Sequence, residues 1–233
     1  MSLPVSVRIL AIETSGMACS AALYADGDIQ QRYALAPRQH AALILPMIES
    51  LLVEACIKVT QLDALAFGRG PGSFTGLRIA ASVVQGIAFA AELPVVPVST
   101  LAALALGAMR ESGEAQVLAA LDARKNEVYW GAYRHVDEDI ARLQGDECVC
   151  LPETITEPQY CNWVGAGSGW AAYGPLLLAR TGDRVLRVLP DLEPVARDVA
   201  RLAVDVFAKG QVISPEQVCP VYLRNNVADP RPA

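Results

Sequence analysis

The chain has 233 residues, of which 53% are hydrophobic and 19% charged, so it can bury a sizeable core and is not a disordered protein. Its net charge of −6 argues against a protein that binds nucleic acid tightly by itself, because neutralising phosphates requires a basic surface. No run of about 18 apolar residues lacks a charge, and the N-terminal apolar run leads into a turn, so we expect neither a membrane span nor a signal peptide.

The cysteines and histidines argue against a zinc or disulfide framework. The six cysteines contain no CxxC pair, and without an export signal they predict reduced thiols in a cytoplasmic protein. The two histidines, His40 and His135, lie far apart and form no HExxH motif, so a histidine-based catalytic metal site is not expected.

The first part of the chain predicts three strands followed by alternating helices and strands. The predicted order is strand 9–13, strand 19–25, strand 29–35, helix 37–57, strand 62–68, helix 77–92, strand 93–99 and helix 100–110. Asp26-Gly27 is a strong hairpin signal, so the first three strands should form an antiparallel meander. Pro46 lies inside the first predicted helix and is expected to kink it.

The second part predicts fewer elements. They are strand 117–123, strand 127–134, strand 163–170 and helix 195–210 with Gly210 as its C-cap. A meander followed by parallel strands and helices is the unit of the actin, sugar-kinase and Hsp70 superfamily. We therefore expect an α/β, actin-like fold of two related lobes, with residues 1–108 in the N-terminal lobe and residues 109–233 in a smaller C-terminal lobe with a tail.

Two segments have the form of phosphate loops. In the superfamily the first strand ends in an acid, here Glu13 in place of the more frequent Asp, and the amides of the next turn face phosphate. An ordinary hairpin turn with a satisfied polar pair is, however, the more frequent reason for such a segment. The loop 68–76, GRGPGSFTG, matches neither GxGxxG nor the P-loop motif. Ser73 can cap the next helix, and Phe74 suits a protein contact better than a phosphate, so nucleotide binding and a structural loop both stay open.

Three further segments carry a chemical alternative. The helix 77–92 is rich in small residues, which favours either close packing within its own lobe or a helix–helix interface with a partner. Asp122, Arg124 and Glu127 suggest acid–base chemistry, although a salt-bridged hairpin is the more frequent reason for this pattern. The glycines of 165–169 lie where the superfamily places its adenosine loop, but a single glycine loop is weak support.

Five segments, taken in order, resemble the TsaB (YeaZ) family: ILAIETS, RGPGSFTGLRIA, ALDARKNEVYWG, VGAGSGW and PVYLRNNVA. The resemblance runs from about residue 8 to residue 228, and GPGSFTGLRI is its most specific part. It implies an actin-like fold and a cytoplasmic, non-catalytic subunit. Such a subunit binds and activates a TsaD-type catalytic paralogue, which transfers threonylcarbamoyl to the adenosine beside the tRNA anticodon.

The resemblance also sets expectations for partners and cofactors. ATP and metal are expected on partner subunits, with none bound by this chain alone. A TsaE-type ATPase joins the pair, tRNA is reached indirectly through the complex, and a homodimer is expected when the chain is alone.

We expect no catalytic, cofactor-binding or metal-binding residue in this chain, and a partner surface on the helices 37–57 and 77–92. The candidate interface residues are His40, Leu43, Met47, Phe74, Arg78, Ala81, Gln85 and Ala88. The alternative is an active small phosphotransferase or ATPase of the same superfamily, for which Glu13 and Asp122 are the candidate carboxylates. A metalloprotease is a poor fit, because the sequence lacks a histidine pair.

Overall fold

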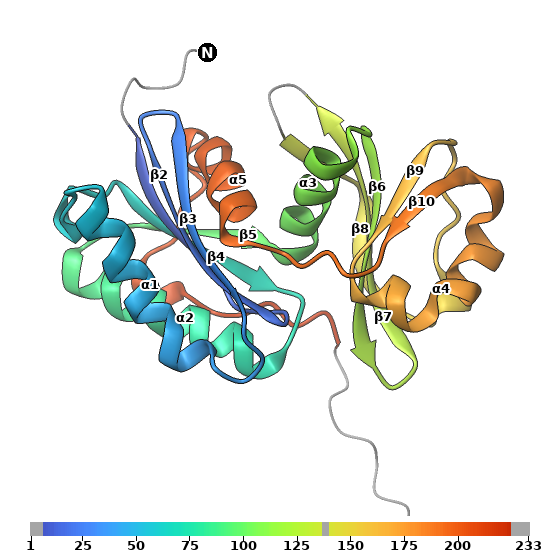
Figure 1. The fold of residues 1–233 in the computed structure, drawn as a ribbon, viewed down its shortest axis with the longest axis horizontal. Coiled ribbons are helices and arrows are strands. Elements are labelled where there is room, and N and C mark those ends of the chain that lie inside the picture. Colours follow the sequence, from blue (N-terminus) through green and yellow to red (C-terminus); the bar gives the residue numbers. More distant parts are fainter. Residues whose placement is uncertain (1–6, 137–139, 225–233) are drawn as a thin grey trace, which may run out of the picture.

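The computed structural model describes residues 7–136 and 140–224, which form two five-stranded mixed sheets, each with helices on both faces (Figure 1). The strand order is β3-β2-β1-β4-β5 in the first sheet and β10-β9-β6-β7-β8 in the second. The predicted α/β, actin-like fold of two lobes is confirmed. The last residues of the PVYLRNNVA motif, 225–228, lie outside the described residues.

The first sheet begins with the predicted meander. Its strands are β1 (Arg8–Glu13), β2 (Ala18–Ala25), β3 (Asp28–Leu35), β4 (Ala64–Gly70) and β5 (Val95–Ser99). β1 pairs antiparallel with β2 and parallel with β4. Asp26 and Gly27 both have positive φ, 54° and 94°, so the turn that they were predicted to form is confirmed.

Helices cover both faces of this sheet. α1 (His40–Glu54) and α2 (Phe74–Ala91) lie on one face, and α5 (Ala196–Ala208) lies on the other (Figure 1). α1 continues through Pro46, whose side chain is exposed. The C-cap of α5 is Lys209, one residue before the predicted Gly210, which follows it at φ 69°. By length and composition alone, α2 is the one described helix that could cross a membrane; in the structure its buried side packs on β4.

The second sheet repeats the arrangement with different helices. Its strands are β6 (Gln116–Arg124), β7 (Glu127–Val136), β8 (Ile140–Cys150), β9 (Trp163–Ala166) and β10 (Val185–Leu189). α3 (Thr100–Ser112) covers one face and α4 (Ser168–Thr181) the other. Four short 3-10 helices complete the described fold: η1 (Val59–Gln61), η2 (Pro152–Thr154), η3 (Gly182–Arg184) and η4 (Pro215–Gln217).

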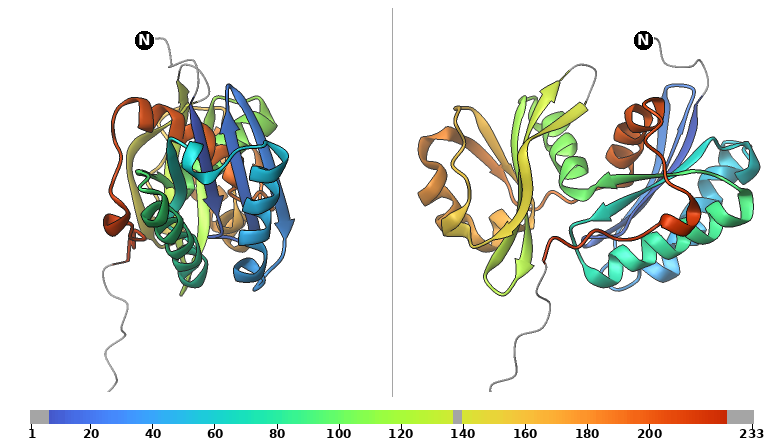
Figure 2. Two further views of the ribbon diagram at one scale, coloured as in Figure 1. Left: turned by 90° about the vertical axis from the view of Figure 1, so that its left-hand side faces the viewer. Right: turned by 180° about the vertical axis from the view of Figure 1, so that it is seen from behind.

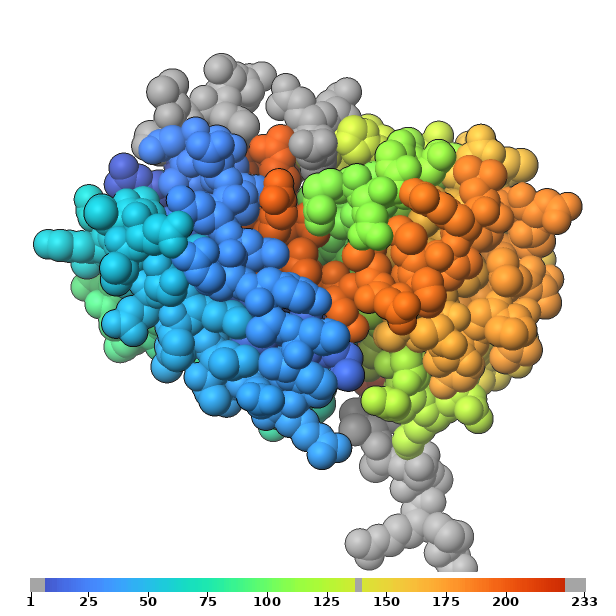
Figure 3. All heavy atoms as spheres, in the orientation of Figure 1, coloured from blue at the N-terminus to red at the C-terminus, as the bar shows by residue number. Residues whose placement is uncertain are grey.

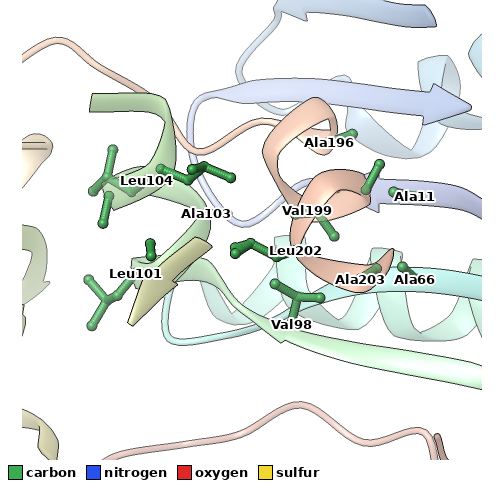
Figure 4. Packing of buried hydrophobic residues seen from close by; sticks show 14 of the residues in the cluster. Ala11, Ala66, Val98, Leu101, Ala103, Leu104, Ala196, Val199, Leu202 and Ala203 are labelled. Carbon is green, nitrogen blue, oxygen red and sulfur yellow. The ribbon is translucent and has the colours of Figure 1, made fainter. Parts of the chain in front are cut away.

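The two sheets are joined by a shared core between α3 and α5. Leu101 and Leu104 of α3 lie in the same buried cluster as Val199 and Leu202 of α5 (Figure 4). Separate clusters lie under α1 and α2 in the first lobe and under α4 in the second. The interior is therefore continuous from one lobe to the other.

The lobes do not divide at one point of the chain. α3 packs on the strands of the second sheet, although most of it precedes the predicted boundary at residue 108. α5 packs on the strands of the first sheet, and the tail returns to the same lobe (Figure 2). Within this tail, Ile213 forms a β-bridge with Val95. The single boundary is corrected accordingly: residues 196–224 belong mainly with the first lobe, because the chain crosses between the sheets more than once.

Candidate functional site

The two candidate phosphate loops pack directly on each other. Thr14 Oγ1 donates a hydrogen bond of 2.8 Å to the carbonyl oxygen of Gly76, and the amide of Ser73 donates one of 2.8 Å to the carbonyl oxygen of Ser15. A Cβ atom on Gly76 would lie 1.9 Å from the backbone carbonyl oxygen of Thr14. The glycine is thus required for contact between the loops, which leaves that side of the turn no room for a ligand.

Glu13 lies inside the first lobe. Its side chain is completely buried, its Oε1 accepts a 2.6 Å hydrogen bond from the amide of Ser15, and its Oε2 lies 3.5 Å from Thr100 Oγ1. A Cβ atom on Gly68 would lie 1.8 Å from Oε2, so the carboxyl group fills the space that this glycine leaves. Burial raises the pKa of Glu13 from 4.5 to about 7.

A second carboxylate, that of Glu193, accepts a hydrogen bond at the end of the same turn. Glu193 Oε2 accepts a 2.7 Å hydrogen bond from the amide of Met17, and a Cβ atom on Gly16 would lie 2.0 Å from that oxygen. Burial raises the pKa of Glu193, while hydrogen bonds from the amides of Met17 and Ala18 lower it in part. No sequence pattern indicated this role, because Glu193 lies in an irregular segment far from the turn.

The glycines of 165–169 are used for packing. A Cβ atom on Gly165 would lie 2.6 Å from the ring of Trp170, and one on Gly169 would lie 2.8 Å from Ala120 Cβ. Trp170 Nε1 donates a 2.9 Å hydrogen bond to the carbonyl oxygen of Leu118. The segment therefore holds α4 against β6, and the candidate adenosine loop is closed by its own lobe.

The β6–β7 turn is the salt-bridged hairpin that the sequence favoured. Arg124 pairs with Asp122 at 3.0 Å, and the amide of Arg124 donates a 2.8 Å hydrogen bond to the same carboxylate. Glu127 forms an ion pair with Arg224 of the tail. Tyr173 OH lies 3.3 Å from Asp122 Oδ1, so this carboxylate already has several partners.

The tail links the two lobes, because it contacts the glycine-rich loop and α2 of the first lobe and β6 of the second. The amide of Val221 donates a 2.7 Å hydrogen bond to the carbonyl oxygen of Arg69. The ring of Tyr222 lies 5.6 Å from that of Phe74, and Arg224 donates a 3.1 Å hydrogen bond to the carbonyl oxygen of Ala123 in the second lobe. The tail thereby crosses from the first lobe to the β6–β7 turn (Figure 2).

The candidate interface residues differ in exposure. Phe74, Arg78 and Gln85 are exposed, and Leu43 and Met47 are partly buried. His40, Ala81 and Ala88 are buried, with 8%, 7% and 0% of their surface exposed. His40 was predicted as a surface residue and is corrected to a buried position at the start of α1.

Ala81 and Ala88 are therefore corrected from surface to core positions. They lie seven residues apart, close to two helical turns, and share the inward side of α2 with Leu77 and Val84. The outward small residues are instead Ser82, Gly86 and Ala90, at a spacing of four.

The exposed candidates do not form one patch. Phe74 and Arg78 contact Tyr222 of the tail, and Gln85 donates a 3.0 Å hydrogen bond to the carbonyl oxygen of Pro215. Leu43 and Met47 lie on the side of α1 that carries Ser50 and Glu54. Arg32 of β3 reaches that side, where it donates a hydrogen bond to Ser50 and forms an ion pair with Glu54. The exposed and partly exposed candidates therefore lie on two separate sides of the α1 and α2 pair, one next to the tail and the other next to β3.

The outward surface of α1 and α2 is partly apolar, and a hollow lies beside it between α2 and η4. We call the α1–α2 surface the set Leu45, Ile79, Ser82, Val83, Gly86, Phe89 and Ala90. Leu45 is 54% exposed and Phe89 is 67% exposed. A hollow of about 440 Å³ is lined by Ser82, Gln85, Gly86, Phe89, Pro215 and Glu216. α1 lies at the outer surface of the first lobe in the space-filling view (Figure 3).

No cluster of three or more His, Cys, Asp or Glu side chains that could hold a metal ion occurs within residues 7–136 and 140–224.

A larger cavity, of about 780 Å³, opens between α3, α5 and the β2–β3 turn. Its lining includes Arg110, which pairs with the buried Asp198 at 3.1 Å, and does not include the turn after β1.

A family model and several known proteins are similar to this chain over most of its length. Residues 34–229 match the family model TsaD, tRNA N6-adenosine threonylcarbamoyltransferase. The tRNA threonylcarbamoyladenosine biosynthesis protein TsaB of Escherichia coli K12 is 44% identical over 95% of this chain and 96% of its own length. The protein of the same name from Haemophilus influenzae is 40% identical, with 95% of each chain covered.

A solved structure supports the same assignment. YeaZ from Pseudomonas aeruginosa superposes with a TM-score of 0.87 and 45% sequence identity, over 93% of this chain and 100% of that one. The similarity covers nearly the whole chain and therefore both lobes. The chain belongs to the TsaB (YeaZ) family and has a role in the synthesis of threonylcarbamoyladenosine in tRNA.

Proposed function

We propose that the chain is a non-catalytic subunit that binds and activates a TsaD-type catalytic paralogue for threonylcarbamoyl transfer to the adenosine beside the tRNA anticodon. The observation that carries this proposal is the occupation of the turn after β1 by the chain's own carboxylates. The amides of Ser15 and Met17, which would meet a phosphate, already donate to Glu13 and Glu193. ATP and metal are accordingly expected on the partner subunits.

The proposed contact with the paralogue is the α1–α2 surface. Its outward side combines exposed apolar side chains, Leu45 and Phe89, with the small residues Ser82 and Gly86, which let a partner helix approach closely. A second copy of the chain would use the same surface when the paralogue is absent, because related folds pack through equivalent faces.

The remaining parts of the proposal concern the assembly and its location. A TsaE-type ATPase joins the pair, and tRNA is held through the complex, because a net charge of −6 gives this chain little attraction for phosphates. The proposed site of action is the cytoplasm.

The alternative of an independent phosphotransferase or ATPase has weaker support. It needs a carboxylate that faces the substrate to act as a base or to hold magnesium. Glu13 is enclosed in the core, and Asp122 is shared between Arg124 and Tyr173. These contacts favour a structural role for both carboxylates over catalysis or magnesium binding.

Reconstitution with the TsaD, TsaE and threonylcarbamoyl-adenylate synthase homologues of the same organism tests the proposal. Modified tRNA should form with the full set and fall to background when this chain is omitted, while the chain alone should hydrolyse no ATP. Undiminished modification without the chain would refute the activating role. Robust ATP turnover by the chain alone, abolished in Glu13→Ala, would instead support the alternative.

A further inference from the structure

Two cysteines of β8 lie in direct contact. The Sγ atoms of Cys148 and Cys150 are 3.8 Å apart, and both side chains are partly buried. Residues two apart on a strand point to the same face, here the face that packs on the cluster under α4. Their Cα partners on β7 are Trp130 and Val128. The pair is independent of the proposed partner surface, since β8 is an edge strand of the second sheet.

We propose that Cys148 and Cys150 form a redox-responsive dithiol that a low-molecular-weight disulfide converts reversibly into an intrastrand disulfide. The class of oxidant is a small disulfide such as glutathione disulfide. Only two sulfur ligands meet here, and no third metal-ligating side chain joins them among the described residues, so the geometry favours oxidation over metal binding.

The reaction proceeds by two thiol–disulfide exchanges. The thiolate of Cys148 attacks one sulfur of glutathione disulfide, forms a mixed disulfide and releases one glutathione thiolate. The thiol of Cys150 then loses its proton to solvent, and its sulfur attacks the Cys148 sulfur, which releases the second glutathione. The two cysteines lose two electrons and two protons, and one glutathione disulfide becomes two molecules of glutathione.

The local chemistry suits this order of attack. A hydrogen bond with Cys150 lowers the pKa of the Cys148 thiol from 9.0 to about 7, despite partial burial, and the same contact raises the pKa of Cys150. The contact between the two sulfurs therefore favours Cys148 as the attacking thiolate and Cys150 as the resolving thiol.

The backbone of β8 is irregular enough to adjust to a disulfide bond between Cys148 and Cys150. Residues two apart on a strand are separated by about 6.6–6.8 Å, at the upper end of the Cα–Cα range of disulfides, so the strand must shorten. β8 is irregular just before Cys148, where residues 145–147 face only Gly131 of β7, and Gly145 has φ 81°. Cys150 is the last residue of the strand. The strand can therefore adjust at both sides of the pair.

The test is oxidation of the full-length protein in glutathione buffers of rising disulfide fraction, followed by alkylation of free thiols and peptide mass mapping. The Cys148–Cys150 peptide should lose two hydrogens, escape alkylation, and regain both thiols on reduction. Cys148→Ser and Cys150→Ser should each abolish this product, and in Cys150→Ser a glutathione adduct should persist on Cys148. Cys219→Ser, which removes an exposed thiol elsewhere, is the matched control and should leave the product unchanged.

Two results would overturn the proposal. One is full alkylation of Cys148 and Cys150 in buffers that already convert the exposed thiols Cys56 and Cys161 to glutathione adducts. The other is a disulfide that joins either cysteine to a different residue or a second chain. The mapping uses the unmodified protein, so the result stands even where a variant fails to fold.

Discussion

Glu193 Oε2 lies 2.7 Å from the backbone nitrogen of Met17, although the two residues are 176 positions apart in the sequence. The contact joins the segment before α5 to the turn after β1. It also places a carboxylate against a backbone amide of the turn that was predicted as a candidate phosphate loop. A carboxylate of the chain itself thereby satisfies backbone donors that otherwise need a ligand.

Replacing Glu193 by alanine should lower the free energy of unfolding by about 0.5–1.5 kcal/mol, because the backbone amide of Met17 loses its side-chain acceptor. Urea denaturation at pH 7.5 measures the change. Asp191→Ala, an exposed acid two residues away, is the control and should alter stability by less than about 0.5 kcal/mol. Equal effects of the two substitutions would show that the Glu193 contact contributes little.

Glu13 should make the protein less stable as the pH rises. Its folded pKa of about 7 exceeds the ordinary value of 4.5, so folding favours the protonated form. Its favourable contribution is complete below pH 4.5 and is lost as the pH rises towards 7, by at most about 3 kcal/mol. Glu13→Gln keeps an acceptor for the Ser15 amide without the charge. The stability of the variant relative to the unmodified protein should therefore improve from pH 5 to pH 7.5, and a constant difference across that range would contradict the assignment.

The two sides of α2 should respond differently to arginine. Gly86 is exposed, and no atom lies within 4 Å of the position that a Cβ would take there, so Gly86→Arg should fold normally. It should nevertheless weaken binding to the TsaD homologue at least about tenfold by blocking close approach. Ala88→Arg should fail to fold, because Ala88 is fully buried. Circular dichroism checks the fold, and calorimetry measures binding.

Ala171→Arg is the matched control for that experiment, since it adds the same charge to an exposed position of α4 in the other lobe. It should bind the TsaD homologue as the unmodified protein does. Normal binding by folded Gly86→Arg would move the partner surface away from α2 without affecting membership of the family.

The isolated protein should bind tRNA only weakly at physiological salt. With 19 basic and 25 acidic residues, it offers few phosphate contacts and little counterion release. A gel-shift titration measures the affinity. Tight binding that weakens steeply with added salt would reveal a basic surface that the composition conceals.

The sequence predicted those elements whose patterns are local. The meander followed from buried strands and the Asp26-Gly27 turn, and the helices of the first lobe followed from apolar spacing. β8 was not predicted because it is an edge strand with a polar stretch, 144–147, and no regular alternation. α4 was not predicted because it starts in a glycine-rich segment and contains Pro175.

The candidate site was only partly accessible to the same reasoning. Small residues alone do not indicate which side of α2 faces outward; the larger Leu77 and Val84 define the inner side and place Ala81 and Ala88 beside them. The role of Glu193 depends on the folded position of a distant segment, and no local pattern encodes it. The hairpin ion pair of Asp122 and Arg124 was predictable because its residues are neighbours in sequence.

The exchange of α3 and α5 between the sheets determines how the molecule should come apart. Each helix packs on the other and on both sheets, so neither half of the chain retains a closed interior when the other is removed. A fragment that ends at residue 108 would lack α5 and expose one whole face of its sheet to water. We therefore expect the two lobes to unfold together in a single cooperative transition, with coincident loss of helix content and tryptophan burial.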